Sequence, residues 1–271
     1  MSPLFVVLLL LLGSATGFLA GLLGIGGGML LVPFLAMLFT AHAVPEQHVL
    51  HLAIATSLTT ILFTSASSVR AHQLRRVVRW DIVKAMAGGA VVGTFVGAQI
   101  ASLLRTRSLA IFFAVFVGSS GLAMLRNAGK IVPDKGRPLP GPLGLFGAGT
   151  VIGFVSSLLG AGGGFITVPF LGWRRVVIHE AVATSAAMGF PIAAGGLIGY
   201  VVAGWNVEGL PPLTIGFVYL PALVACALAS VLTAPFGARA AHALPVKSLK
   251  NIFALLLVGL AIYMAWKAYR S

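Results

Sequence analysis

The sequence carries a glycine-rich break inside an apolar segment, and it carries this break twice. Residues 24–33 read GIGGGMLLVP, and residues 160–169 read GAGGGFITVP. Four glycines in five positions oppose an ordinary helix, because each one costs up to about 1 kcal/mol relative to alanine. The proline that follows also removes a backbone hydrogen-bond donor. A break that recurs in this form indicates a functional site.

The composition places these segments in a membrane. Apolar residues make up 59% of the 271 positions and charged residues only 8%, whereas soluble domains carry about 25% charged residues. Several apolar stretches reach the roughly 20 residues that a membrane-spanning helix needs, but 29–39 and 165–172 are too short. We therefore expect an all-α polytopic membrane protein. The apolar stretches are 4–23, 29–39, 52–69, 82–104, 108–125, 143–159, 165–172, 181–203, 214–236 and 251–266.

The similarity around the break continues along the chain and divides it into two homologous halves. Residues 17–35 and 153–171 are identical at 12 of 19 positions. The pattern H-x-A-x-A-T-S that begins at His51 recurs from His179. We expect one integral membrane domain that consists of a first transmembrane repeat, a basic linker and a second transmembrane repeat. Their boundaries are 1–126, 127–142 and 143–271.

The charge balance excludes several classes of function. The net charge is +13, from 18 Lys and Arg against 5 Asp and Glu, and the positive residues fall between the apolar stretches. This placement is typical of cytoplasmic loops and of contact with anionic lipids, so we expect no nucleic-acid partner. Because carboxylates are scarce and Cys226 is the only cysteine, we expect no metal site and no disulfide. The chain offers no nucleophile beside a base, so we expect neither an enzyme nor a cofactor.

Basic residues in corresponding loops distinguish parallel halves from inverted ones, because cytoplasmic loops collect Lys and Arg. The loop 40–51 has none, whereas its counterpart 172–180 carries two arginines. The loop 70–84 carries five basic residues, and its counterpart 204–213 has none. In each pair one loop is basic and its counterpart is not, which places corresponding loops on opposite sides of the membrane and favours an inverted repeat. The alternative is a chain of eight simple crossings with parallel halves.

Inversion requires an odd number of crossings in each half, and the glycine break provides one way to reach it. Residues 4–39 and 143–172 would each enter and leave the membrane on one side, as a helical hairpin that folds at the glycines. Three ordinary spans would follow in each half. The expected fold is thus two inverted repeats, each a glycine-broken hairpin plus three transmembrane helices.

The two glycine runs are the first candidate binding residues. Irregular backbone at membrane depth survives only where it is buried in protein or lines a cavity. A helix that starts after each run would direct free N–H groups and the positive end of its dipole inward, which suits an oxyanion. The alternative is that glycines only permit close helix crossing, which is our interpretation of Gly89, Gly93 and Gly97. The candidate substrate-binding glycines are Gly24, Gly26, Gly27, Gly28, Gly160, Gly162, Gly163 and Gly164.

A second candidate group is a repeated Thr-Ser pair. Thr56 and Ser57 in the first half correspond to Thr184 and Ser185 in the second. Hydroxyls inside apolar helices often bond their own backbone four residues back and have no further role. Because both pairs occupy the same position of the repeat, we keep them as candidate ligand hydroxyls beside that structural alternative.

Five further polar residues complete the candidates. His51 and His179 are repeated, and either a structural role or proton coupling fits them, because imidazole titrates near neutral pH. Glu180 follows His179 and could share the coupling role. Gln99 and Arg239 occupy corresponding positions and are candidate accessory residues, although we expect Arg239 to extend toward a basic loop.

Two copies of G-x-G-G-G-x-x-x-V-P-x-L, each followed by an A-T-S helix, resemble the TauE/SafE family of bacterial membrane permeases. The resemblance covers essentially the whole chain. It implies a place in the cytoplasmic (inner) membrane of a bacterium and movement of small sulfur oxyanions or organosulfonates, such as sulfite. It implies a class of substrate and not one ligand. The positions that carry it are Gly24–Gly28 with Pro33, Gly160–Gly164 with Pro169, and the two Thr-Ser pairs.

We therefore expect a secondary transporter, in particular an exporter, with one central anion site to which the two halves give alternating access. No nucleotide-binding motif is present, so an ion gradient, the membrane potential or the substrate gradient would drive transport. The alternatives are a gated anion channel, a permease for another small organic anion, or a membrane subunit without transport. The expected partners are a small anionic substrate and membrane lipids. A homo-oligomer, the direction, the coupling ion and the identity of the anion stay open.

Overall fold

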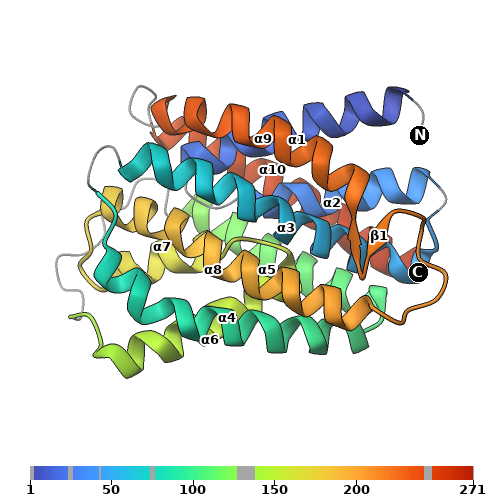
Figure 1. Cartoon of the computed structure of the whole chain (residues 1–271). Helices are drawn as coiled ribbons and strands as arrows, with labels where there is room; N and C mark the ends of the chain where they lie inside the picture. The colour runs from blue at the N-terminus through green and yellow to red at the C-terminus, as the bar shows by residue number, and fades with distance from the viewer. Residues whose placement is uncertain are drawn as a thin grey trace.

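The structure is a bundle of helices. The computed structural model describes residues 3–23, 27–42, 44–73, 77–126, 138–240 and 246–270. Its long helices run side by side along one direction, which confirms the predicted all-α architecture (Figure 1). The helices of the first half are α1 (Pro3–Leu23), α2 (Gly28–Ala41), α3 (Glu46–Gln73), α4 (Trp80–Leu103) and α5 (Thr106–Arg126). Those of the second half are α6 (Pro142–Leu159), α7 (Gly164–Trp173), α8 (Ile178–Gly204), α9 (Leu220–Ala240) and α10 (Val246–Arg270).

The lengths of these helices confirm a polytopic membrane protein. Seven helices in the described part of the chain are long and apolar enough to cross a membrane. The helices α2 and α7 are apolar but have only 14 and 10 residues. Large apolar side chains such as Leu11, Val115 and Ile262 are exposed on the outside of the bundle. In a bilayer, lipid rather than water covers such side chains.

The glycine breaks lie where α2 and α7 begin. Gly27 precedes α2 with a φ of 66°, and Gly163 precedes α7 with a φ of 76°. Both values lie in the left-handed region, which glycine enters without steric cost. Each glycine therefore turns the chain and starts a new, shorter helix. Gly24, Ile25 and Gly26 lie outside the described residues.

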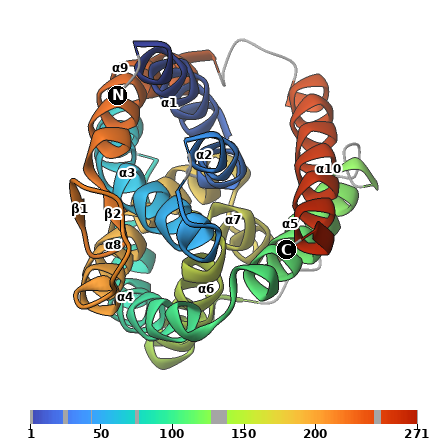
Figure 2. The same cartoon turned by 90° about the vertical axis from the view of Figure 1, so that its right-hand side faces the viewer.

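Helices of one half pack mainly on helices of the other half. The helix α1 packs along α9, α4 along α6 and α8, and α5 along α10, while α3 contacts both α8 and α9. Seen along the helix axes, α2 and α7 lie inside the bundle, with α3 and α8 on one side and α5 and α10 on the other (Figure 2). The two broken hairpins thus place their short helices at the centre of the protein.

The central long helix is α3. In its most apolar stretch 83% of the residues are buried, compared with 33% for α5 and 39% for α1. Three of its hydroxyls bond carbonyls of their own helix, namely Thr59 and Thr60 at 2.8 Å and Thr64 at 3.1 Å. Such bonds are the usual solution for a hydroxyl in an apolar helix. The buried hydroxyl residues of α3 are Thr56, Ser57, Thr59, Thr60, Thr64, Ser65 and Ser68.

The helices α4 and α6 cross closely, as we expected from the small residues of α4. A Cβ on Gly93 would overlap the carbonyl oxygen of Thr150, and one on Gly89 would overlap the carbonyl oxygen of Phe146. Gly97 faces Ser157 in the same way. Small residues allow helices in a membrane to approach closely enough for extensive van der Waals contact. These glycines have a packing role.

The start of α9 differs from the predicted span. We expected an apolar span from residue 214, but Thr214–Ile215 (β1) and Val218–Tyr219 (β2) form an antiparallel hairpin, and α9 begins at Leu220. The cause is the backbone at Gly216, whose φ of 54° reverses the chain between the two strands. Apolar composition alone does not reveal this turn, because the strand residues are as apolar as those of a helix.

The α4–α6 crossing predicts opposite responses to alanine at two glycines. Gly93→Ala would push the helices apart, and overpacking of this kind costs about 1–3 kcal/mol. Gly147→Ala would add a methyl group where no atom of another helix lies within 4 Å, and alanine favours a helix by up to about 1 kcal/mol. We expect a lower midpoint of thermal unfolding in detergent for Gly93→Ala and an unchanged or higher one for Gly147→Ala. Equal midpoints would contradict the described crossing.

Candidate functional site

The two glycine breaks touch each other in the interior. A Cβ on Gly28, the first residue of α2, would lie 2.8 Å from the Cα of Ala161 and would overlap the carbonyl oxygen of Gly160. A Cβ on Gly160 would lie 3.0 Å from the Cα of Ile54 in α3. All these residues are buried. The described part of each break therefore faces protein, not lipid, which irregular backbone at membrane depth requires.

Each break leaves backbone donors at the start of a helix. In α7 the Gly163 carbonyl accepts from the amides of Ile166 and Thr167, at 3.0 and 2.9 Å. The amides of Gly164 and Phe165 have no acceptor among the described residues. This is the ordinary state of a helix N-terminus, whose first amides lack a partner within the helix and which carries a partial positive charge.

The start of α2 repeats this arrangement. The Gly27 carbonyl accepts from the amides of Leu30 and Leu31, at 3.1 and 3.2 Å. The amides of Gly28 and Met29 find no acceptor in the described chain. Because Gly28 packs on the end of α6, the start of α2 lies in the core, close to the break from which α7 begins. Helix starts that lie near each other in the core suit a negatively charged ligand.

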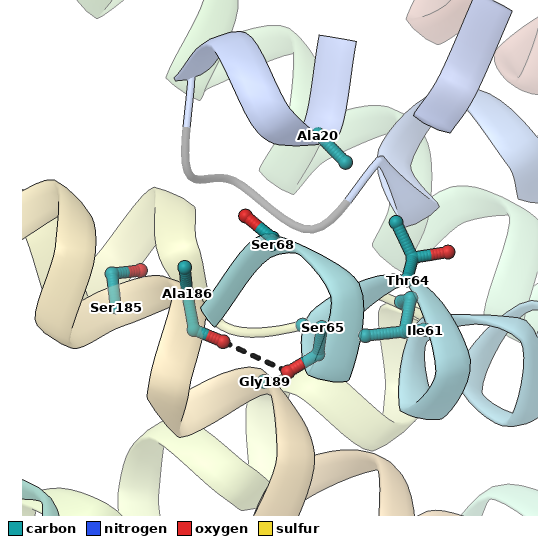
Figure 3. A pocket seen from close by; sticks show the side chains of 9 residues that line it. Ala20, Ile61, Thr64, Ser65, Ser68, Ser185, Ala186 and Gly189 are labelled. Atoms are coloured by element: carbon teal, nitrogen blue, oxygen red, sulfur yellow. Dashed lines mark hydrogen bonds between the residues drawn. The ribbon is translucent and has the colours of Figure 1, made fainter. Parts of the chain in front are cut away.

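A small cavity lies beside this meeting point, between α1, α3, α8 and the second break (Figure 3). The centre of a water molecule can move through about 10 Å³ of it, which is close to the least volume that holds one water molecule. An oxyanion would therefore enter only after the surrounding helices move apart. The lining residues are Ala20, Ile61, Thr64, Ser65, Ser68, Gly162, Ser185, Ala186 and Gly189.

Hydroxyl groups of α3 give this cavity its polar wall. The Ser65 hydroxyl donates to the Ala186 carbonyl at 2.8 Å (Figure 3). Thr64 Oγ1 lies 2.7 Å from Ser230 Oγ and 3.1 Å from the Thr60 carbonyl oxygen. These contacts join α3 to α8 and α9, and they fix the positions of the two hydroxyls.

Ser68 is the exception in this wall. Its side chain is 3% exposed, and its Oγ has no hydrogen-bond partner in the described chain. A buried unpaired hydroxyl costs about 1–3 kcal/mol, so its retention needs a reason such as a ligand or a water molecule. Ser68 was not among the residues predicted from the sequence. The signal was present, because Ser57, Thr64, Ser65 and Ser68 recur along one face of a helix.

The cavity brings together only part of the predicted site. Gly162 and Ser185 line it. Ser57 does not, and its hydroxyl instead donates to the Gly160 carbonyl at 2.7 Å. This bond ties α3 to the second break and so holds the wall in place. Gly27, Gly28, Gly160, Gly163 and Gly164 form the breaks themselves, while Gly24 and Gly26 lie outside the described residues.

The two predicted threonines lie outside the cavity and make equivalent contacts. Thr56 Oγ1 accepts from the Tyr219 amide at 3.1 Å, just before α9 begins. Thr184 Oγ1 accepts from the Arg79 amide at 3.1 Å, just before α4 begins. Each hydroxyl thus satisfies a backbone donor at the start of a helix in the other half, which is a capping role.

The candidate coupling residues also lie away from the cavity. His51 Nε2 lies 3.1 Å from the carbonyl oxygens of Ala101 and Leu104, so the ring joins α3 to the end of α4. His179 is exposed. Glu180 Oε2 lies 3.5 Å from Arg79 Nη1. The second ion pair of Arg79, with the Asp81 carboxylate, raises the pKa of Arg79 above its ordinary value and keeps it charged.

The two candidate accessory residues differ in their surroundings. Gln99 Nε2 donates to the Gly199 carbonyl at 2.8 Å and links α4 to α8. Arg239 is exposed, and its guanidinium carbon lies 5.8 Å from the centre of the Phe236 ring. Neither residue lines the cavity. Their contacts are those of helix packing and of an interfacial cation.

Comparison with known proteins gives consistent matches over the whole chain. The family model described as sulfite exporter TauE/SafE matches residues 9–264. A "Probable membrane transporter protein" of Haemophilus influenzae is 36% identical over 265 residues, which cover 97% of this chain and 99% of that protein. A protein of Methanocaldococcus jannaschii with a similar name is 26% identical over 264 residues, which cover 96% of each chain. No solved structure matches significantly.

The hydrogen bonding in the cavity predicts opposite effects of two serine substitutions on the stability of the ligand-free protein. Ser68→Ala removes an unpaired hydroxyl, so we expect the free energy of unfolding to rise or stay the same. Ser65→Ala leaves the Ala186 carbonyl without its donor, so we expect a loss of about 1 kcal/mol. Thermal unfolding in detergent without added anions measures both. A destabilised Ser68→Ala variant would show that this hydroxyl has a partner in the protein.

Proposed function

The chain belongs to the TauE/SafE family of sulfite exporters, and we propose that it exports small sulfur-containing anions, such as sulfite or organosulfonates, as a secondary transporter of the bacterial cytoplasmic membrane. The observation that carries this proposal is that the starts of α2 and α7 both lie close to a hydroxyl-lined cavity in the core. Membership in the family establishes a multi-pass membrane transporter. The substrate and the direction belong to the proposal.

The geometry supports an anion as the ligand. The start of an α-helix carries roughly half of a positive elementary charge, and its unpaired amides point at a ligand placed there. The starts of α2 and α7 lie close to the cavity, and the unpaired Ser68 hydroxyl adds a donor to its wall. An oxyanion would exchange its hydration shell for these groups. Glycine at the breaks lets the backbone come close to it.

The inverted arrangement of the halves is part of this proposal. Thr56 of α3 contacts the residue before α9, and Thr184 of α8 contacts the residue before α4. Contacts of this reciprocal kind support halves that run in opposite directions, with the starts of α3 and α8 at opposite ends of the bundle. Inverted repeats of this sort allow a carrier to open first on one side and then on the other.

The membrane potential supports export as the direction. An inside-negative potential favours the exit of an anion by about 2.3 kcal/mol per charge per 100 mV. Export by uniport then needs no coupling ion. The positions of His51 and His179 away from the cavity are compatible with this simple scheme, although coupling to protons remains an alternative that transport measurements address.

A gated anion channel is the second candidate function. The small volume of about 10 Å³ favours a carrier, because a conducting pore would need a continuous wet path. A permease for another small organic anion would use the same donors. Carriers and channels differ in one measurable respect, since only a carrier exchanges a labelled anion faster when unlabelled anion is present on the opposite side.

The test of the proposed function is transport by the purified protein in liposomes. We expect labelled sulfite and methanesulfonate to cross faster than in protein-free liposomes, with acceleration by unlabelled anion on the opposite side. Acetate tests for a general organic-anion permease. Flux without such acceleration and at channel rates would favour the channel. The absence of flux for all three anions would remove the proposed function.

A matched pair of variants tests whether the cavity is the transport site. Ser68→Ala removes a donor that would bond the anion, and the loss of about 1 kcal/mol of binding corresponds to roughly a fivefold weaker affinity. Ser67→Ala is the control, because the Ser67 hydroxyl donates to the Val231 carbonyl and does not line the cavity. We expect a higher KM for Ser68→Ala and a wild-type KM for Ser67→Ala.

The inverted repeat predicts that two corresponding loops lie on opposite sides of the membrane. Cys226 is buried, so cysteines placed at exposed positions can be labelled against a low background. We expect an impermeant thiol reagent added to intact cells to label Ala41→Cys but not Val177→Cys. Disruption of the cells should expose the second cysteine. Labelling of both from outside would indicate parallel halves.

A further inference from the structure

We propose that the cavity selects singly charged oxyanions over doubly charged ones, so that sulfite crosses the membrane as hydrogensulfite. This inference rests on the proposed function and specifies the charge of its substrate. The inference depends on how many positive groups lie near the cavity and on whether they are side chains or helix ends.

The wall of the cavity carries no ionisable side chain in the described chain. The helix α3 contributes alcohol and aliphatic groups, and α1, α8 and the second break contribute alanine, glycine and Ser185. A bound anion is therefore not paired with a lysine or an arginine of this wall.

The charged side chains that the structure describes lie outside this wall. Lys267 is the one buried Lys, Arg, Asp or Glu among the side chains that the structure describes, and its Nζ donates to Thr40 Oγ1 at 2.7 Å. Thr40 lies 12 residues after the start of α2, which is about 18 Å along a helix. Arg79 is occupied by Asp81 and Glu180.

Among the residues that the structure describes, the positive charge near the cavity thus comes from helix ends. Each helix N-terminus is equivalent to roughly +0.5 of an elementary charge. The starts of α2 and α7 lie close to the cavity, and together they supply at most about one positive charge, because the end of α6 at Gly160 carries an opposite partial charge. Such a charge matches no more than one negative charge on a ligand. A second negative charge would remain uncompensated in a region that lipid and apolar side chains surround.

The hydroxyl donors near the cavity do not compensate the second negative charge of a doubly charged anion. Ser65 commits its proton to the Ala186 carbonyl, and Ser57 commits its proton to the Gly160 carbonyl. Ser68 can donate one hydrogen bond. Neutral donors stabilise an ion less than an opposite charge does in a medium of low dielectric constant, where an unpaired charge is strongly disfavoured. The site therefore discriminates by charge.

The experiment measures tracer exchange in liposomes at equal pH on both sides, over a range that spans the second pKa of sulfite. The wild-type protein is tested with labelled sulfite at a fixed subsaturating total concentration. Methanesulfonate is the control substrate, because it carries one charge over the whole range and so reports any titration of the protein itself. Sulfate is tested as the doubly charged anion. Protein-free liposomes give the passive leak at each pH.

We expect sulfite exchange above that pKa to fall about tenfold per pH unit, in proportion to the singly charged fraction. Methanesulfonate exchange should stay constant, and sulfate exchange should equal the leak. Sulfite exchange that stays constant or rises with pH would overturn the inference, as would sulfate exchange comparable to that of sulfite. Both of these results would leave the proposed function intact. Absence of exchange for sulfite and methanesulfonate at every pH would instead reject the proposed function.

Ligand-induced stabilisation provides a second readout that does not depend on reconstitution. An anion that binds the folded protein raises its midpoint of thermal unfolding. In detergent at constant ionic strength, methanesulfonate should raise the midpoint and sulfate should not. A matching rise with sulfate in the wild-type protein, absent in the Ser68→Ala variant, would place a doubly charged anion in the cavity and overturn the inference.

Discussion

Backbone that leaves the helical path inside a membrane must be enclosed by protein, because lipid cannot bond its amides and carbonyls. This chain meets that constraint by packing Gly28 against Gly160 and Ala161, so that the two irregular segments enclose each other. The arrangement requires glycine, since any side chain at Gly28 would overlap the opposing carbonyl. It also explains why Ser57 bonds the Gly160 carbonyl. The pairing of helices from opposite halves follows from the need to surround this contact.

The helix starts near this contact offer the proposed anion a positive environment without a basic side chain in the described wall of the cavity. Helix ends provide a fixed, partial charge that needs no counter-ion and adds no side chain to the crowded centre. The helix α3 supplies the remaining polarity through alcohol groups, most of which are already bonded within the protein. The unpaired hydroxyl of Ser68 is a cost to the folded state, and binding of the substrate would repay it.

The sequence allowed the breaks, the apolar helices and the hairpin-plus-three order of each half to be predicted, because glycine density and hydropathy act locally. It could not place the cavity. Ser68 has Gly196 as its counterpart, so the repeat does not mark it, and serines in helices often bond their own backbone. The repeat did mark Thr56 and Thr184, but what they share is the capping of a distant amide. Gly216 concealed a turn in an apolar stretch.

The two halves are unequal in the wall that they offer to the cavity. Thr64, Ser65 and Ser68 of α3 correspond in the repeat to Ile192, Ala193 and Gly196 of α8, which have no hydroxyl. A carrier built from such halves binds its cargo with different strength in its two orientations. At the same concentration gradient, its rate of transport in one direction then differs from its rate in the reverse direction. This asymmetry affects rates only, because at equilibrium detailed balance prevents it from building up a concentration difference of the cargo.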